Sequence, residues 1–324
     1  MDARSVVVVG YAGAELLDIA AITTSLEMAN RIGRPDAPYR ISVAAPGGRP
    51  IACASGLVLR AQLPLTAALG PLDTLVVSGG PGHARAAADP VIVGHVRRLA
   101  GQSRRVSSVC TGASLLAAAG LLDGRRATTH WQYADHLAAE YPAVTVDAEP
   151  IYIRDGNVST AAGVTSALDL MLAFIEEDHG AELAREVARA LVTYLQRPGD
   201  QAQISMFTAA PHAEHDLVRR VAGYIGAHLD GDLTTAALAK VAGVSPRHLT
   251  RLFLAHLGHP PGRFVRRART EAAARLLSTT ALPVARVAAR CGFGSAESLR
   301  QAFVRHYGVP PSEHRAADGR VSPR

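Results

Sequence analysis

The sequence predicts an α/β amino-terminal domain, with a mostly parallel sheet and helices on both faces, and an all-α carboxyl-terminal domain with two helix-turn-helix motifs. The first half of the chain alternates β-branched runs with helical patterns, whereas the second half is helical throughout. A length of 324 residues suits about two domains. The first part of the chain is slightly acidic, with 17 Arg and 20 acidic residues up to residue 210. The rest is strongly basic, with 17 basic and 8 acidic residues.

Strands are expected where β-branched residues run together before a glycine-bearing turn, at residues 5–9, 39–45, 73–78 and 105–109. Residues 151–154 and 157–160 flank Asp155-Gly156, a turn signal that predicts an antiparallel edge hairpin. From residue 163 to about residue 194, apolar residues recur at helical spacing with a break near Gly180. This pattern predicts two packed helices that close the first domain.

The domain boundary is expected after Arg197-Pro198-Gly199-Asp200, which combines a helix stop with a turn. The segment that follows has weak periodicity. We therefore expect a first domain over residues 1–197, a linker over 198–211, a second domain over 212–318 and a disordered tail over 319–324.

Several classes of protein are excluded. No apolar stretch approaches the roughly 20 residues that span a bilayer, and no signal-peptide pattern opens the chain, so a cytoplasmic protein without membrane contact is expected. The three cysteines, Cys53, Cys110 and Cys291, lie far apart without a C-x-x-C pair, which argues against a disulfide framework. The spacing of His, Cys, Asp and Glu indicates no metal site, and nothing indicates a cofactor.

Two turns after predicted strands form the candidate site, because open parallel sheets bind ligands beyond the carboxyl ends of their strands. Cys110-Thr-Gly-Ala-Ser114 joins a strand directly to a helix, whose amino terminus favours a thiolate and can lower the pKa of Cys110. Gly79-Gly-Pro-Gly82 lets backbone N–H groups approach an anion closely. Together the two turns are expected to form an oxyanion hole.

These residues resemble the ThiJ/PfpI, class I glutamine amidotransferase-like family. The resemblance is carried by the nucleophile elbow Val109-Cys-Thr-Gly-Ala113, by residues 119–131 and by the loops Gly79-Gly-Pro-Gly82 and Thr160-Ala-Ala-Gly163. It implies that Asp18 contacts the elbow cysteine and that His130 lies beside the same site. The ligand-binding residues predicted in this way are Asp18, Gly79, Gly80, Cys110, Thr111, His130 and Trp131.

The chemistry of Cys110 has three alternatives. The peptidase and amidase branch of the family places a His directly after the cysteine as a base, and this chain has Thr111, which favours a non-catalytic sensor. Isonitrile-hydratase-like members pair the thiol with an acid and a Thr, so Cys110, Asp18 and Thr111 remain candidate catalytic residues of a hydrolase or hydratase. The third alternative is an oxidant sensor that acts through Cys110.

The second half contains two similar units, at residues 233–253 and 282–303. Each has a small-residue helix, a glycine turn (Gly243, Gly292), a serine suited to cap the next helix (Ser245, Ser295) and an L-x-x-x-F pattern. Two helix-turn-helix motifs within one basic block predict a protein that binds double-stranded DNA.

The outward faces of the two recognition helices carry side chains suited to base edges. Arg263, Arg266 and Arg267 either clamp phosphates or form a solvated cluster. Cys291 is expected to be a small buried residue. The predicted DNA-binding residues are Arg247, His248, Thr250 and Arg251 in the first motif and Ser295, Glu297, Arg300 and Gln301 in the second.

From about His212 to Arg315 the chain resembles the AraC/XylS DNA-binding domain, most specifically in Gly292-Phe293, Phe303 and Gly308-Val-Pro-Pro-Ser312. The whole chain resembles the fused ThiJ/PfpI–AraC regulators sometimes called GlxA-type. This resemblance implies a homodimeric transcription regulator whose recognition helices enter successive major grooves about 34 Å apart. It also implies a small polar or amino-bearing metabolite as effector, bound near Cys110. RNA polymerase is a further candidate partner.

Overall fold

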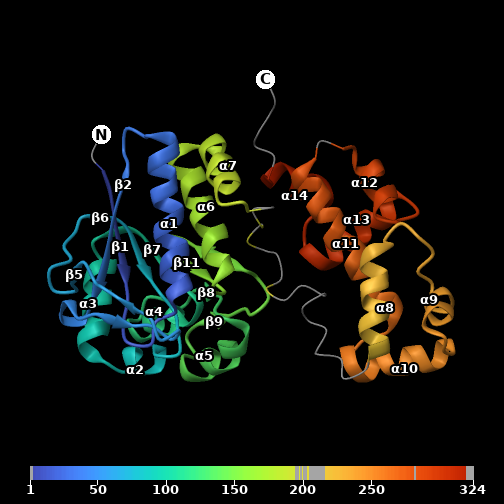
Figure 1. Cartoon of the computed structure of the whole chain (residues 1–324), viewed down its shortest axis with the longest axis horizontal. Coiled ribbons are helices and arrows are strands. Elements are labelled where there is room, and N and C mark those ends of the chain that lie inside the picture. Colours follow the sequence, from blue (N-terminus) through green and yellow to red (C-terminus); the bar gives the residue numbers. More distant parts are fainter. Residues whose placement is uncertain are drawn as a thin grey trace. The chain divides into compact units, whose positions relative to one another are not determined.

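The computed structural model describes residues 3–193, 197, 199, 203, 216–280 and 282–318. Contacts within the chain divide it into two compact units, unit 1 (residues 1–203) and unit 2 (residues 204–324). Figure 1 shows strands and helices in unit 1 and helices alone in unit 2. The predicted tail, and the predicted linker apart from Gly199 and Gln203, lie outside the described residues.

Unit 1 is built on a seven-stranded sheet with the strand order β10-β11-β7-β6-β1-β2-β5. Neighbouring strands are parallel except for the edge pair β10–β11, so the predicted parallel sheet and antiparallel hairpin are confirmed. The strands are β1 (Arg4–Val9), β2 (Tyr39–Ala45), β5 (Leu63–Pro64), β6 (Leu72–Val77), β7 (Ser103–Val109), β10 (Tyr152–Asp155) and β11 (Val158–Ala161).

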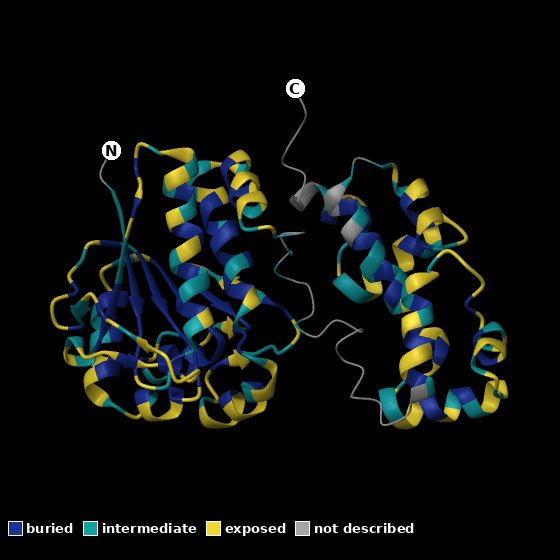
Figure 2. Cartoon of the chain, viewed as in Figure 1, coloured by how far each residue is buried: buried dark blue, intermediate teal, exposed yellow. Residues whose placement is uncertain are grey.

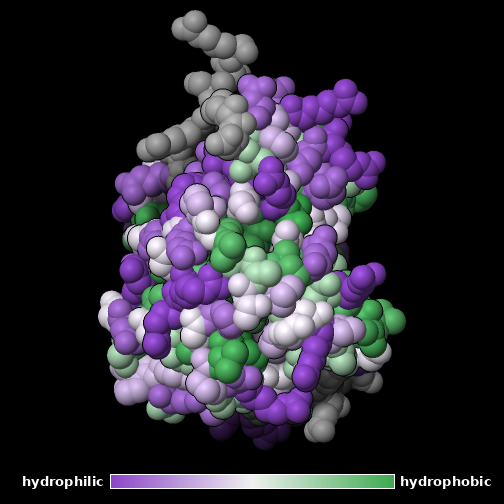
Figure 3. All heavy atoms as spheres, turned by 90° about the vertical axis from the view of Figure 1, so that its left-hand side faces the viewer, coloured by the Kyte–Doolittle hydropathy of each residue, from purple (hydrophilic) through white to green (hydrophobic). Residues whose placement is uncertain are grey.

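The central strands are buried and the outer surface is mixed. Figure 2 shows the strands in dark blue at the centre of unit 1, with exposed residues on the surrounding helices and loops. Figure 3 shows apolar groups separated by hydrophilic residues on one side of the molecule. Within the described part of the chain, no helix is long and apolar enough to cross a membrane.

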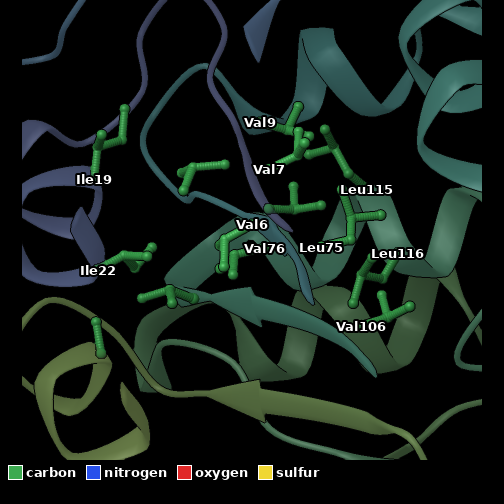
Figure 4. Packing of buried hydrophobic residues seen from close by; sticks show 14 of the residues in the cluster. Val6, Val7, Val9, Ile19, Ile22, Leu75, Val76, Val106, Leu115 and Leu116 are labelled. Atoms are coloured by element: carbon green, nitrogen blue, oxygen red, sulfur yellow. The ribbon is translucent and has the colours of Figure 1, made fainter. Parts of the chain in front are cut away.

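Two groups of helices cover the sheet. In one group, α1 (Leu16–Gly33), α6 (Thr165–His179) and α7 (Ala181–Ala190) pack together; in the other, α4 (Ala113–Ala118) packs against α2 (His83–Ala87) and α3 (Pro90–Ala100). Figure 4 shows Ile19 and Ile22 of α1 on one side of the central strands and Leu115 and Leu116 of α4 on the other. The predicted helix pair with a break at Gly180 is confirmed. Gly180 lies between α6 and α7 and has φ 91°.

Short elements complete unit 1. Small sheets pair β3 (Ile51–Ala52) with β4 (Val58–Leu59) and β8 (Arg126–Ala127) with β9 (Thr145–Val146). The remaining helical elements are η1 (Pro46–Gly48), η2 (Cys110–Gly112), η3 (Trp131–Tyr133) and α5 (Ala134–Glu140).

A buried ionic cluster lies at the amino ends of the strands, the opposite end from Cys110. The Asp178 carboxylate, with a side chain only 2% exposed, pairs with Arg104 at 2.7 Å and also with Arg105. The guanidinium of Arg105 lies 4.0 Å from the centre of the Phe174 ring. Arg4 joins the cluster through Asp73 at 2.8 Å.

The pKa of Asp73 shows how this cluster depends on pH. Burial alone would raise this pKa, but hydrogen bonds from Arg104 and Thr74 and the charges nearby lower it from 3.8 to about 2. Because the folded pKa is depressed, the unfolded chain takes up this proton first as the pH falls. The stabilisation, about 2 kcal/mol, is therefore complete above about pH 5 and is lost as the pH falls through 4 towards 2.

Unit 2 contains two apolar cores joined by one long helix. Helix α11 contributes Phe264 and Ala268 to the first core and Ala273 and Leu277 to the second. Cys291 is buried in the second core, as expected. The helices are α8 (Asp216–Ala227), α9 (Thr235–Ala242), α10 (Pro246–Leu257), α11 (Pro261–Thr279), α12 (Val284–Arg290), α13 (Ala296–Tyr307) and α14 (Pro311–Asp318).

The two halves of unit 2 meet at Arg269 and Gly292. Arg269 donates from Nε to the carbonyl of Leu229 and from Nη2 to that of Gly231, each at 2.8 Å. Gly292 has φ 74°, and a Cβ at this position would lie 2.1 Å from the Leu229 carbonyl oxygen. The turn after α8, in the first half, is therefore held tightly against the turn of the second motif.

Candidate functional site

Cys110 lies at a strained turn between β7 and α4. It follows the last residue of β7 directly, has φ 56° and is 8% exposed. Two glycines make room for it: a Cβ at Gly79 would lie 2.5 Å from the Cys110 Cβ, and one at Gly163 would lie 3.3 Å from the Cys110 Sγ. The strand-to-helix elbow inferred from the sequence is thus formed, with glycine-bearing loops on both sides.

Asp18 connects two of the loops around this elbow. Its Oδ2 accepts the N–H of Gly79 and its Oδ1 accepts the N–H of Val164, both at 3.0 Å. The side chain is fully buried, and burial raises its pKa to about 7 despite these two hydrogen bonds. The Asp18 carboxylate therefore holds both the loop after β6 and the start of α6. With a pKa of about 7, this carboxylate changes its charge near neutral pH.

Thr111 holds the same loop through a reciprocal pair of hydrogen bonds. Its Oγ1 accepts the N–H of Gly80 at 2.8 Å and donates to the carbonyl of Gly80 at 2.9 Å. The amide of Gly79 is already bonded to Asp18. The expectation that this loop contributes its amides to an oxyanion hole is therefore wrong for Gly79 and Gly80, because both N–H groups are bonded within the protein.

The electrostatics of Cys110 also differ from the expectation. Burial, followed by the negative charge of Asp18, raises the pKa of the thiol to about 12. The expected lowering by the helix amino terminus is wrong, because loss of solvent and a nearby carboxylate outweigh it. Cys110 is a protonated thiol at neutral pH, which makes it a poor nucleophile.

His130 and Trp131 lie next to the elbow. A Cβ at Gly163 would lie 3.2 Å from the His130 ring and 3.3 Å from the Cys110 Sγ. Both side chains therefore pack against Gly163. Burial lowers the pKa of His130 and so favours its neutral form. Its ring stacks on the indole of Trp131 at 5.8 Å between centroids. Trp131 is 47% exposed and offers an aromatic face to solvent.

Sequence reasoning missed two further side chains here, Tyr11 and His83. The Tyr11 hydroxyl donates to the carbonyl of Ser78 at 2.9 Å, and burial, then the charges of Cys110 and Asp18, raise its pKa. The Nδ1 atom of His83 lies 3.0 Å from the Ser114 Oγ. Their position was the available signal, because Tyr11 and His83 follow the carboxyl ends of β1 and β6.

The predicted capping of both recognition helices is confirmed. Ser245 accepts the N–H of His248 at 3.2 Å, and Ser295 forms a capping box with Ser298. Gly243 ends α9 in the left-handed conformation, at φ 69°. The inward residues Leu249, Phe253, Leu299 and Phe303 are all fully buried. These residues orient α10 and α13 with their polar faces outward.

In the first motif, Arg247 and Arg251 are exposed on α10, whereas His248 and Thr250 are partly buried. The hydroxyl of Thr250 donates to the Pro246 carbonyl at 2.9 Å, and the Nη2 of Arg251 lies 2.9 Å from the Nδ1 of His248. The two arginines are therefore the long polar side chains that this helix presents.

In the second motif, three predicted DNA-binding residues bind one another on the surface of α13. The Glu297 carboxylate accepts hydrogen bonds from Arg300 at 2.7 and 2.8 Å and from Gln301 at 3.1 Å. These bonds, chiefly those from Arg300, lower the pKa of Glu297 to about 2. The fourth, Ser295, uses its hydroxyl as the helix cap.

On α11, Arg263 and Arg266 are exposed, whereas Arg267 pairs with Glu271 at 3.0 Å. The three arginines therefore do not form one uniform cluster. Within the described residues, His, Cys, Asp and Glu side chains are nowhere grouped to hold a metal ion.

Comparison with known proteins gives two family matches. The model of the DJ-1/PfpI family matches residues 4–177, and that of a helix-turn-helix domain matches residues 238–317. Among solved structures, a ThiJ/PfpI family protein from Pseudomonas syringae is similar with a TM-score of 0.57 and 25% identity, covering 69% of this chain and 88% of that chain.

Curated relatives extend over nearly the whole chain. The HTH-type transcriptional regulator CdhR of Pseudomonas aeruginosa is 34% identical over 94% of this chain and 89% of its own length. The regulator GlxA of Rhizobium meliloti is 31% identical over 98% of both chains. An isonitrile hydratase of Pseudomonas putida is 36% identical, but over 52% of this chain and 72% of its own.

Proposed function

Because the chain belongs to the DNA-binding transcriptional regulators that join a DJ-1/PfpI domain to an AraC-type helix-turn-helix domain, we propose that a small metabolite bound at the elbow controls its binding to DNA. The elbow site comprises Asp18, Gly79, Gly80, Cys110, Thr111, His130 and Trp131. In this proposal residues 1–197 sense the metabolite, residues 198–211 link the domains, residues 212–318 bind DNA and residues 319–324 form a tail. The protein acts in the cytoplasm as a homodimer, with RNA polymerase as a further partner.

The main support for sensing is that the residues of the elbow are held in place by hydrogen bonds, whereas the Cys110 thiol is not ionised. Asp18 is bonded to two loops, while the Cys110 thiol stays protonated and the amides of Gly79 and Gly80 are already bonded. A neutral thiol beside a stacked His130–Trp131 pair suits reversible binding of a small polar or amino-bearing molecule. The same features make a cysteine-dependent hydrolase or hydratase the weaker alternative, since the Cys110 thiol is protonated and the Gly79 and Gly80 amides are already bonded.

The effector can be found through the DNA that the protein binds. Genome-wide mapping of bound DNA identifies neighbouring genes, whose products indicate candidate metabolites. We expect one candidate to change the fluorescence of Trp131, the only tryptophan in the chain, and to change operator affinity by about 5- to 150-fold. Such coupling requires that the metabolite bind the DNA-competent and incompetent states with different affinities.

Cys110→Ala distinguishes sensing from catalysis. If the wild type converts a candidate amide or isonitrile and Cys110→Ala does not, the elbow is catalytic and the sensing proposal fails. If no candidate changes both the Trp131 signal and the operator affinity, control by a metabolite at this site is contradicted.

We also propose that Arg251 and Arg300 select the DNA sequence. Replacing either with Ala should weaken binding to the selected operator by about 1 to 3 kcal/mol, which is roughly 5- to 150-fold, because an Arg–guanine pair discriminates by that amount. Binding to unrelated duplexes should change much less. Fluorescence anisotropy with operator and scrambled duplexes at fixed salt measures both quantities.

Arg263→Ala serves as the control, because a phosphate contact contributes equally to every sequence. It should weaken binding to both duplexes alike and reduce the salt dependence. If the operator-to-scrambled ratio is unchanged in both Arg251→Ala and Arg300→Ala, the assignment of these residues is wrong.

A further inference from the structure

The last residue of unit 1, Gln203, is anchored to the chain segment that carries the elbow residues His130 and Trp131. Its Nε2 amide donates to the Thr129 carbonyl at 2.8 Å and to the Thr128 hydroxyl at 2.9 Å. Its Oε1 accepts the backbone N–H of Trp131 at 3.0 Å. The Gln203 side chain thus donates to and accepts from residues 128–131.

The same segment is bonded directly to the elbow. The Thr129 hydroxyl donates to the backbone carbonyl of Cys110 at 2.9 Å. The next residue, His130, stacks on Trp131 and lies across Gly163 from the Cys110 thiol. Residues 128–131 therefore contact Cys110 on one side and Gln203 on the other.

Gln203 also marks the point at which the chain leaves unit 1, since unit 2 begins at the next residue. Its backbone N–H donates to the carbonyl of Glu149 at 2.7 Å, and its Nε2 also reaches the carbonyl of Pro150 at 3.2 Å. These bonds hold the last residue of unit 1 against residues 149–150.

We propose that residues 128–131 and Gln203 form a relay that couples the elbow to the DNA-binding unit by docking or releasing Gln203. This inference rests on the proposed function and specifies how the elbow site exerts control. Hydrogen bonds weaken steeply when their angles distort, so a ligand that shifts His130 or Trp131 changes the docking of Gln203. By linkage, DNA that prefers one docking state must in turn alter the surroundings of Trp131.

A second anchor provides a matched control. Arg197 donates to the buried Asp169 carboxylate of α6 from its backbone N–H at 2.7 Å, from Nε at 2.9 Å and from Nη2 at 2.6 Å. Its Nη2 also donates to Thr165. Arg197 thus holds the same part of the chain to unit 1 through α6 rather than through residues 128–131.

The test uses the full chain, a duplex that the wild type selects from a random pool, and Trp131 fluorescence as the readout. We expect the duplex to shift the Trp131 emission of the wild type and of Arg197→Gln. Gln203→Ala should bind the same duplex with the shift abolished, because the connection to residues 128–131 is removed. No metabolite is needed, so this result is independent of whether an effector is found.

Gln203→Glu gives a second variant in case truncation disturbs folding. It keeps the oxygen that accepts the Trp131 N–H but lacks the amide that donates to Thr128 and Thr129, so the shift should again be lost. The relay is overturned if both Gln203 variants keep the DNA-induced shift, or if the wild type shows none. It is also overturned if Arg197→Gln abolishes the shift as fully as Gln203→Ala does, since any loosening of the chain would then suffice.

Discussion

Asp178→Ala is expected to lower the free energy of unfolding of unit 1 by about 3 to 5 kcal/mol. The carboxylate of Asp178 is the common partner of Arg104 and Arg105, and its removal leaves the guanidinium of Arg105 buried without that charge. It also removes the acceptor of the Tyr39 hydroxyl, which donates to Asp178 at 2.8 Å. Urea denaturation followed through Trp131, which lies in unit 1, measures the change.

The neighbouring residue gives the control. Glu177 contacts Arg104, Arg105 and Arg154 at 3.7, 3.5 and 3.3 Å, but its side chain is 47% exposed. Solvent screens such pairs, so Glu177→Ala should cost less than about 1 kcal/mol. If the two variants lost similar free energies of unfolding, the burial of Asp178 would not determine its contribution to stability.

Gly292→Ala is expected to destabilise unit 2 by more than about 2 kcal/mol. The left-handed conformation at φ 74° costs an alanine about 1 to 2 kcal/mol, and the new Cβ would in addition meet the Leu229 carbonyl at 2.1 Å. The turn after α8 and Arg269 would have to move, which alters the spacing of the two recognition helices. Thermal unfolding followed by helical circular dichroism, together with operator affinity, measures both effects.

Gly243→Ala is the matched variant in the first motif. Gly243 has φ 69°, but nothing lies within 4 Å of the position of its Cβ, so only the conformational cost of about 1 to 2 kcal/mol applies. We expect Gly292→Ala to reduce operator affinity at least tenfold more than Gly243→Ala does. Equal effects would contradict a spacing role for the contact between Gly292 and Leu229.

The features predicted correctly from the sequence are those that neighbouring residues determine. The β-branched run that forms β1, the hairpin turn at Asp155-Gly156 and the serine caps at Ser245 and Ser295 all depend on local spacing. Strand β5 was missed because two residues provide no periodic pattern. Local signals also indicated that Gly292 forms a turn, but not that it packs against Leu229.

The contacts and pKa values of the candidate site could not be predicted from the sequence. The resemblance indicated Asp18 as a neighbour of Cys110, yet its bond to Val164 joins residues 146 positions apart and leaves no trace in either local sequence. The pKa of Cys110 depends on how deeply the thiol is buried, which no spacing of residues reveals. Gln203 was missed for the same reason, since its partners are more than 50 residues away.

In the proposed complex with DNA, Arg300 and Gln301 would exchange their hydrogen bonds to Glu297 for hydrogen bonds to bases. Arg251 of α10 would likewise give up its contact with His248 to bind a base. Guanine, with two acceptors aligned for one guanidinium, would be the favoured partner of Arg300 in this proposal. Because Glu297 accepts from two of these side chains and His248 contacts one, we expect mismatches that face α13 to weaken binding more than mismatches that face α10.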